Sequence, residues 1–148
     1  AVNPSFSSLT NICESLGITM ASLFGAPPGE EINGFHFMRP EERKTLKAEG
    51  GVLFQLLSKG LRLPCEFIMN RWPPGTTTGS EAYVHEGQEC GLLLEGELIV
   101  EALGRTYHLQ PGDTVTFDSS IPHRVINPGK KEAVAIWLNT DPIIFAIT

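Results

Sequence analysis

The stretch "HEGQECGLLLEGEL", residues 85–98, joins two kinds of sequence that are usually found apart. It opens with His85 and, four residues later, Glu89, then becomes apolar over residues 92–94 and closes at Gly96. A short apolar run between turn residues is typical of a core β-strand. Imidazole and carboxylate side chains are ligands for metal ions. The stretch therefore predicts a core strand with candidate metal ligands at one end.

The four-residue spacing of His85 and Glu89 limits how their side chains can meet. On a helix they would share a face, but Gly87 lies between them and the flanking sequence is strand-like. On one straight strand they would lie about 13 Å apart, too far for a single ion. A bend at residues 86–88 remains, because neighbours on adjacent strands lie about 5 Å apart.

A second histidine of interest lies in "SSIPHRVIN", residues 119–127. Pro122 suits the start or edge of a strand, and His123 follows it directly. Two histidines and one carboxylate form the facial set that binds Fe(II) with open positions, and zinc accepts the same set. The alternative is that each histidine is a hydrogen-bonded core or rim residue. That alternative is favoured for His36 and His108, and both interpretations stay open for His85 and His123.

Composition narrows the class of protein. The 148 residues suit one core of ordinary size, and the apolar runs are too short to span a bilayer, so no membrane partner is expected. The net charge of −6 argues against nucleic-acid binding by this stretch itself. The cysteines are odd in number and form no CxxC pair, which favours reduced thiols in a cytoplasmic protein. They are Cys13, Cys65 and Cys90.

The first 24 residues are helical in pattern. Asn3 can cap a helix with Pro4 at its first position, and Gly17 is a natural stop. The apolar residues of this helix fall on one face: Phe6, Leu9, Ile12, Cys13 and Leu16. A second short helix begins at Thr19, and residues 25–34 have the composition of a linker. Both helices are expected outside the core of the following domain.

After the linker, short strands alternate with turn residues, which predicts an antiparallel sandwich, jelly roll or barrel. The candidate strands are residues 35–38, 52–57, 65–71, 91–94, 98–103, 106–109, 114–117, 123–126, 133–138 and 143–147. The polar stretch "PEERKTLKAE", residues 40–49, fits either a helical turn or an edge strand.

Residues 50–148 resemble the cupin family. The first cupin motif matches His85, Glu89 and Gly96, and the second runs from Gly112 to His123 and Asn127. Three positions depart from the family pattern: Tyr83 replaces the first histidine, and Asp118 and Ser120 replace the usual proline and glycine.

The resemblance implies a mainly β fold, a double-stranded β-helix or jelly-roll barrel. It implies a ligand-binding site at the barrel mouth, formed by Tyr83, His85, Glu89, His123 and Asn127. At most one divalent metal ion (iron, zinc, manganese or nickel) would be held by His85, Glu89 and His123. A pocket without metal is the alternative. Leu92 and Leu94, or their neighbour Leu93, would wall the barrel, and Gly96 would turn a hairpin.

Residues 3–25 are similar to the closing helices of the xenobiotic-response-element family of helix-turn-helix domains. The similarity rests on Asn-Pro-Ser, a Leu/Ile-rich helix, Leu-Gly and a final Leu-Phe. The two resemblances together divide the chain into a helix-turn-helix remnant (1–25), a linker with an edge strand (26–49) and a cupin domain (50–148). The DNA-reading helix would lie before Asn3.

The combination implies the effector-sensing part of a bacterial transcriptional regulator. Its effector would be a small polar metabolite, resembling a polyamine or an amino acid, and its operator DNA would be bound through the preceding helices. A homodimer is expected, since operators of this family are usually two-fold. The alternative is a cupin metalloenzyme, an iron-dependent epoxidase resembling hydroxypropylphosphonate epoxidase. The regulator is favoured over the enzyme.

Overall fold

The computed structural model describes residues 3–18, 23, 30–32, 34–58 and 65–140. These residues form one α-helix, α1 (Phe6–Leu16), and eleven strands. The strands are β1 (Glu30–Ile32), β2 (Phe35–Phe37), β3 (Thr45–Lys47), β4 (Leu53–Leu56), β5 (Cys65–Trp72), β6 (Gln88–Glu95), β7 (Leu98–Ala102), β8 (Arg105–Leu109), β9 (Thr114–Asp118), β10 (His123–Ile126) and β11 (Ala133–Thr140).

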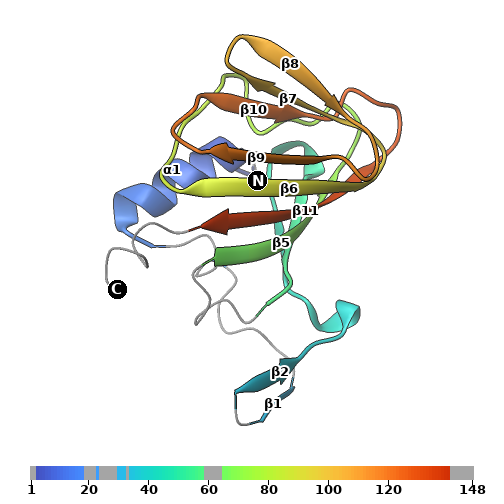
Figure 1. The fold of residues 1–148 in the computed structure, drawn as a ribbon. Coiled ribbons are helices and arrows are strands. Elements are labelled where there is room, and N and C mark those ends of the chain that lie inside the picture. Colours follow the sequence, from blue (N-terminus) through green and yellow to red (C-terminus); the bar gives the residue numbers. More distant parts are fainter. Residues whose placement is uncertain (1–2, 19–22, 24–29, 33, 59–64, 141–148) are drawn as a thin grey trace.

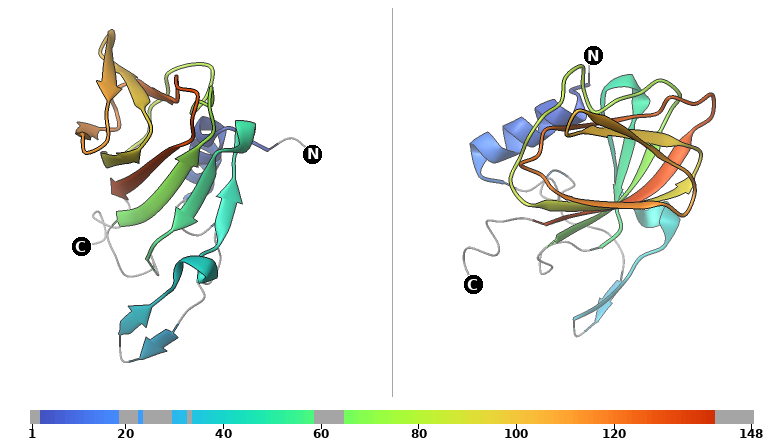
Figure 2. Two further views of the ribbon diagram at one scale, coloured as in Figure 1. Left: turned by 90° about the vertical axis from the view of Figure 1, so that its right-hand side faces the viewer. Right: turned by 45° about the horizontal axis from the view of Figure 1, so that its top comes forward.

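Two antiparallel sheets face one another and form the barrel (Figures 1 and 2). The larger sheet has the order β3-β4-β5-β11-β6-β9, and the smaller has the order β10-β7-β8. The prediction of a mainly β, double-sheet fold is confirmed for the described residues. Gly96 turns the chain between β6 and β7 with φ +78°, but these strands lie in different sheets, so the expected hairpin is instead a crossing from one sheet to the other. The candidate strand 143–147 lies outside the described residues.

Strand β6 settles which leucines wall the barrel. Glu89, Gly91 and Leu93 point inward, and Leu93 is fully buried, whereas Leu94 is 39% exposed. Gly91 pairs with Trp137 of β11, whose ring lies against the glycine so closely that a Cβ there would collide with it. Strand β5 alternates in the same way and turns Ile68, Asn70 and Trp72 inward.

Helix α1 begins two residues later than predicted. Ser5, rather than Asn3, is the N-cap, and its hydroxyl accepts a hydrogen bond from the amide of Ser8. Gly17 caps the C-terminal end in the left-handed conformation, as predicted. The buried face consists of Phe6, Thr10 and Cys13. The predicted face was therefore too wide, because Ile12 and Leu16 are exposed.

The expectation that the N-terminal helices lie outside the core is wrong for α1. The ring of Phe6 stacks on that of Phe54 with centroids 5.0 Å apart, and Phe6 belongs to the hydrophobic core. A helix with one apolar stripe gains stability only by burying it, and here the barrel provides the partner surface. Figure 1 shows α1 behind β6 and β9, on one side of the barrel. The second predicted helix falls almost wholly outside the described residues.

The linker contains structure that its composition did not predict. Strand β1 lies within it and pairs with β2 in a separate hairpin, which projects away from the barrel (Figures 1 and 2). The stretch "PEERKTLKAE" adopts both proposed forms, a 3-10 turn at Pro40–Glu42 and the edge strand β3. Among the described residues, no helix is long and apolar enough to cross a membrane.

Candidate metal and effector site

Two chain segments bring His85 and His123 together. Tyr83 and His123 form an antiparallel bridge, each amide donating to the other's carbonyl oxygen at 3.0 and 3.1 Å. The amide of His85 donates to the carbonyl oxygen of Ser119, and that of Ser119 donates to Gly87. The segment before β6 thus runs beside the segment before β10. The bend predicted at residues 86–88 lies at Glu86 and Gly87, and Gly87 adopts φ +96°.

The departures from the cupin pattern at Asp118 and Ser120 have a local explanation. The carboxylate of Asp118 accepts hydrogen bonds from both the amide and the hydroxyl of Ser120, at 2.9 and 2.7 Å. These bonds from Ser120 lower the pKa of Asp118. An aspartate that bonds to the backbone two residues later forms a turn by itself. This pair therefore forms a turn before His123 at the two positions that depart from the motif.

The two histidines and Glu89 form one compact cluster. Nε2 of His85 lies 3.0 Å from Oε1 of Glu89, and Nε2 of His123 lies 3.2 Å from Oε2. The three candidate ligand atoms are all within 4.8 Å of one another. His123 is fully buried and Glu89 is 3% exposed. The predicted metal ligands are thus within the span of one ion, since zinc–nitrogen bonds are about 2.1 Å long.

The hydrogen bonds of the imidazole rings favour a cation in this cluster. Nδ1 of His85 donates to the carbonyl oxygen of Glu86 at 3.0 Å, and Nδ1 of His123 donates to Ile121 at 2.7 Å. In a neutral ring the proton is then on Nδ1, and the lone pair of Nε2 points at the carboxylate of Glu89. Two lone pairs repel unless a proton or a metal ion lies between them. Nε2 of His123 is also buried without a hydrogen bond within the described structure. The residues present therefore fit a divalent metal ion.

The contacts among His85, Glu89 and His123 also shift the pKa values of His85 and Glu89. Burial alone would lower the pKa of His85, but the hydrogen bond and charge of Glu89 outweigh burial and raise that pKa. Burial would raise the pKa of Glu89, but its contacts with His123 and His85 outweigh burial and lower it. The carboxylate of Glu89 consequently keeps its negative charge inside the barrel.

Tyr83 stands where the cupin motif has its first histidine, and its ring packs on the rings of His85 and His123. Its ring centroid lies 4.6 Å from that of His123 and 5.5 Å from that of His85. Burial, together with the charge of Glu89, raises the pKa of Tyr83 well above its ordinary value. The phenol is therefore neutral and remains a hydrogen-bond donor. Tyr83 thus lies beside both histidines, and its role in ligand binding stays a prediction.

Asn127 is not brought into the cluster. Its Nδ2 donates to the carbonyl oxygens of Trp72 and Lys131, and its Oδ1 accepts from the amide of Gly129, all at 2.8 Å. The side chain therefore closes the loop before β11 and does not face the cavity. His36 and His108 also lie outside the cluster.

An internal cavity lies beside Glu89 and contains residues that sequence reasoning missed. Its lining residues are Phe6, Phe54, Ile68, Asn70, Trp72, Thr78, Tyr83, Glu89, Val125, Trp137 and Asn139. Three of them carry a buried polar atom with no hydrogen-bond partner among the described residues: Oδ1 of Asn70, Oδ1 of Asn139 and Nε1 of Trp72. Of these residues, Asn70 could have been found from the sequence, because it is a polar residue on the inward face of an alternating strand.

Comparison with known proteins agrees with this geometry. Residues 69–139 match the model of the cupin domain family. This match spans just under half of the chain and includes both motifs that indicated a cupin. Over 127 residues it is 29% identical to the HTH-type transcriptional regulator PuuR of Escherichia coli K12, a match that covers 85% of this chain and 67% of that protein.

Solved structures show the same fold. The cupin domain of an XRE-family transcriptional regulator from Enterobacter cloacae has a TM-score of 0.55 and 23% identity, covering 62% of this chain and 97% of that one. An RmlC-like cupin from Shewanella frigidimarina has a TM-score of 0.62 and 20% identity, covering 72% and 90%. At these identities the structures establish the fold, while the similarity to PuuR relates the chain to a transcriptional regulator.

Proposed function

We propose that this chain is the effector-sensing part of a bacterial DNA-binding transcriptional regulator, and that its effector is a small metabolite with a protonated amine. One observation carries the choice of ligand. The cavity presents the carboxylate of Glu89 and, between aromatic walls, two amide oxygens that have no hydrogen-bond partner among the described residues, from Asn70 and Asn139. Each of these oxygens accepts a hydrogen bond from an ammonium group.

The walls support the same class of ligand. Phe54, Trp72 and Trp137 line the cavity, and the faces of aromatic rings attract cations by about 0.5–2 kcal/mol each. A buried oxygen without a partner costs free energy, which a ligand that donates to it recovers. Polyamines and amino acids that carry a side-chain amine combine such a cation with a short apolar chain.

The metal cluster adds a second element to the proposal. His85, Glu89 and His123 would hold one divalent ion, which, when bound, supplies an open coordination position for an oxygen or nitrogen of the ligand. Without the ion, Glu89 still lines the cavity, and His85 and His123 lie beside its carboxylate. Either way, Glu89 is the residue that links the cluster to the cavity.

The DNA-binding half of the function rests on relatives. PuuR is named as an HTH-type regulator, and the Enterobacter cloacae cupin comes from an XRE-family regulator. On this basis the proposal includes operator binding through helices that precede Asn3. It also includes a homodimer and a cytoplasmic location. A bound effector would change operator affinity by favouring one of two arrangements of the protein.

Amine binding is the direct test of the effector class. The chain is titrated with diamines of three to five carbons, spermidine, ornithine and lysine, and binding is followed by calorimetry. At least one amine should bind, and the diol with the same carbon chain should bind about tenfold to 100-fold more weakly. A hydrogen bond to a charged group contributes about 1.5–3 kcal/mol, which corresponds to that range. Glu89→Gln should weaken binding by at least about tenfold.

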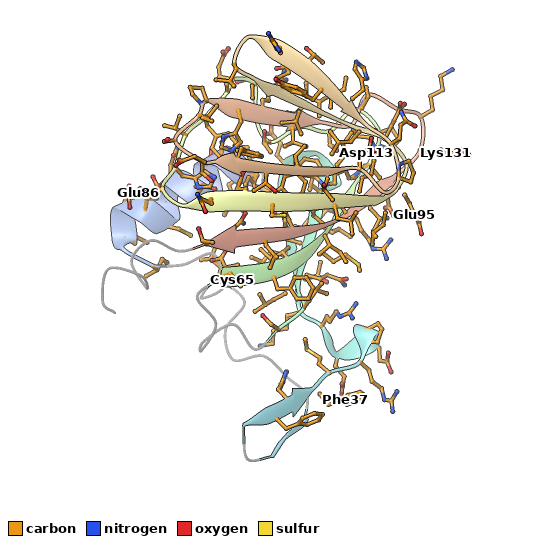
Figure 3. The ribbon with its side chains drawn as sticks, in the orientation of Figure 1. Phe37, Cys65, Glu86, Glu95, Asp113 and Lys131 are labelled. Carbon is orange, nitrogen blue, oxygen red and sulfur yellow. The ribbon has the colours of Figure 1, made fainter. Side chains whose placement is uncertain are left out.

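Glu95→Gln is the matched control. Glu95 ends the same strand at the opposite end of the barrel, where it is exposed (Figure 3). This variant should bind amines as the wild-type chain does. Equal binding of amine and diol, or an equal loss in Glu89→Gln and Glu95→Gln, would contradict the proposed effector class.

A further inference from the structure

The cavity beside Glu89 is too small for a metabolite in the conformation described. The space left among its lining side chains is about 20 Å³. That volume holds about one water molecule, whereas sites for small-molecule ligands measure roughly 300–1,000 Å³. Binding therefore requires one of the lining side chains to move out.

Among these side chains, Phe6 is the one best able to leave. Most of the others stand on strands of the two sheets, held by ladders of backbone hydrogen bonds. Phe6 stands on α1, an 11-residue helix that belongs to neither sheet. Its ring contacts the rings of Phe54 and Tyr83, with centroids 5.0 and 5.9 Å apart. Moving α1 outward would vacate the volume of one aromatic ring without breaking a ladder.

Two hydrogen bonds join α1 to the segment that carries Tyr83 and His85. The amide of Ser7 donates to the carbonyl oxygen of Thr78 at 3.0 Å. At the other end of α1, Oε1 of Glu14 accepts a hydrogen bond from the amide of Glu86 at 3.1 Å. Figure 3 places Glu86 at the end of the barrel where α1 lies.

A hydroxyl-rich groove of about 770 Å³ lies along the N-terminal half of α1 and offers a route inward. Ser5, Ser7 and Ser8 form one wall, and Thr76, Thr77 and Ser80 lie on the other. Tyr83 lines both this groove and the inner cavity. Phe6 lies between Ser5 and Ser7 in the sequence but lines only the inner cavity. The contact of Phe6 with Tyr83 therefore lies between the groove and the inner cavity.

We propose that α1 is a gate: the ring of Phe6 closes the cavity, and a small molecule reaches Glu89 only when α1 moves away from the barrel. The ligand named in this inference rests on the proposed function, whereas the gate rests on the packing of Phe6 alone. Entry of the effector and docking of α1 are then mutually exclusive. The position of the helix that precedes the sensor domain would report whether the cavity is occupied.

An engineered disulfide tests the gate in both directions. A Cβ at position 79 would lie 3.5 Å from the Cβ of Ser7, within the range of about 3.5–4.5 Å that disulfides span. The double variant Ser7→Cys, Gly79→Cys is oxidised to lock α1 in place and then reduced to release it. Peptide mapping verifies that the bond joins these two positions. The same sample serves as its own control, and wild-type protein treated identically controls for the native cysteines.

Tryptophan fluorescence reports access to the cavity without any assumption about the effector. The chain has two tryptophans, Trp72 and Trp137, and both line the cavity. Oxidation should reduce quenching by acrylamide, a small neutral solute, and should weaken binding of the amine panel by about tenfold or more. Reduction should restore both. Phe6→Ala should increase quenching several-fold and strengthen amine binding, whereas Leu16→Ala, on the exposed side of α1, should change neither.

The outcomes separate the gate from the effector class. If no amine binds any form but quenching follows the disulfide, the gate stands and the proposed effector is wrong. If an amine binds with the expected dependence on Glu89 but the oxidised and reduced forms do not differ, the gate is wrong. Weaker amine binding by Phe6→Ala would also overturn it, since Phe6 would then be a wall of the ligand site. Hydrogen exchange verifies that Phe6→Ala retains its strands.

Discussion

Replacing His123 with alanine is expected to abolish metal binding by this chain. The cluster offers three ligand atoms within 4.8 Å of one another, and this substitution leaves two. His123 is fully buried and its ring is oriented by the hydrogen bond from Nδ1 to Ile121, so no neighbouring side chain can easily replace it. Removing even an outer hydrogen-bond partner of a ligand typically costs 10–100-fold in affinity, and losing a ligand costs more.

The measurement is metal content after exposure to zinc, manganese, nickel or anaerobic ferrous iron. Wild-type protein should retain about one ion per chain, the number that one set of three ligands can hold. His123→Ala and His85→Ala should retain almost none. His108→Ala is the control, because His108 is exposed on β8 and lies outside the cluster. Equal uptake by wild-type and His123→Ala would place the ion elsewhere. No uptake by wild-type would establish a pocket that works without metal.

Replacing Gly91 with alanine is expected to destabilise the barrel by about 3 kcal/mol, the upper part of the usual range for overpacking a core. The added Cβ would collide with the ring of Trp137, which lies against the glycine across the β6–β11 pair. Neither strand can retreat, because β6 also pairs with β9 and β11 also pairs with β5. In a chain of this length the midpoint of thermal unfolding should fall by roughly 6–12 °C.

A double variant identifies the cause of that loss. Trp137→Leu removes the ring that the new Cβ would meet, so Gly91→Ala should cost much less in that background than alone. Such coupling is expected for residues in contact. Leu94→Ala, at a more exposed position of the same strand, should change the free energy of unfolding far less. Additive effects of Gly91→Ala and Trp137→Leu would contradict the proposed collision.

The strands were predictable because alternation and turn residues are local signals. The bounds of β10 match the prediction residue for residue, and the bend between His85 and Glu89 followed from the reach of a strand. The His85–Glu89–His123 cluster was predictable for the same reason, since both motifs place their ligands at strand ends. Strand β1 was not, because three residues in a Gly/Pro-rich stretch carry too short a pattern.

The contents of the cavity were not predictable from local patterns. A sequence indicates that Phe6 is on the apolar face of a helix but not which surface that face meets. Asn70 and Asn139 line the same cavity only because β5 pairs with β11, and that pairing is set by the whole sheet. Asn127 shows the opposite case. Its place in a motif suggested a ligand-binding role, whereas its three hydrogen bonds hold a loop.

The most direct test of the sensor function is the affinity of the natural protein that carries this sequence for the DNA upstream of its own gene, measured with and without the tightest amine. We expect sequence-specific binding whose affinity changes about 5–150-fold with the amine, the usual range of allosteric coupling. Glu89→Gln should bind the same DNA but respond far less to the amine. A protein with no sequence-specific DNA binding that instead turns over a substrate when iron is added would contradict the regulator function and establish the enzyme.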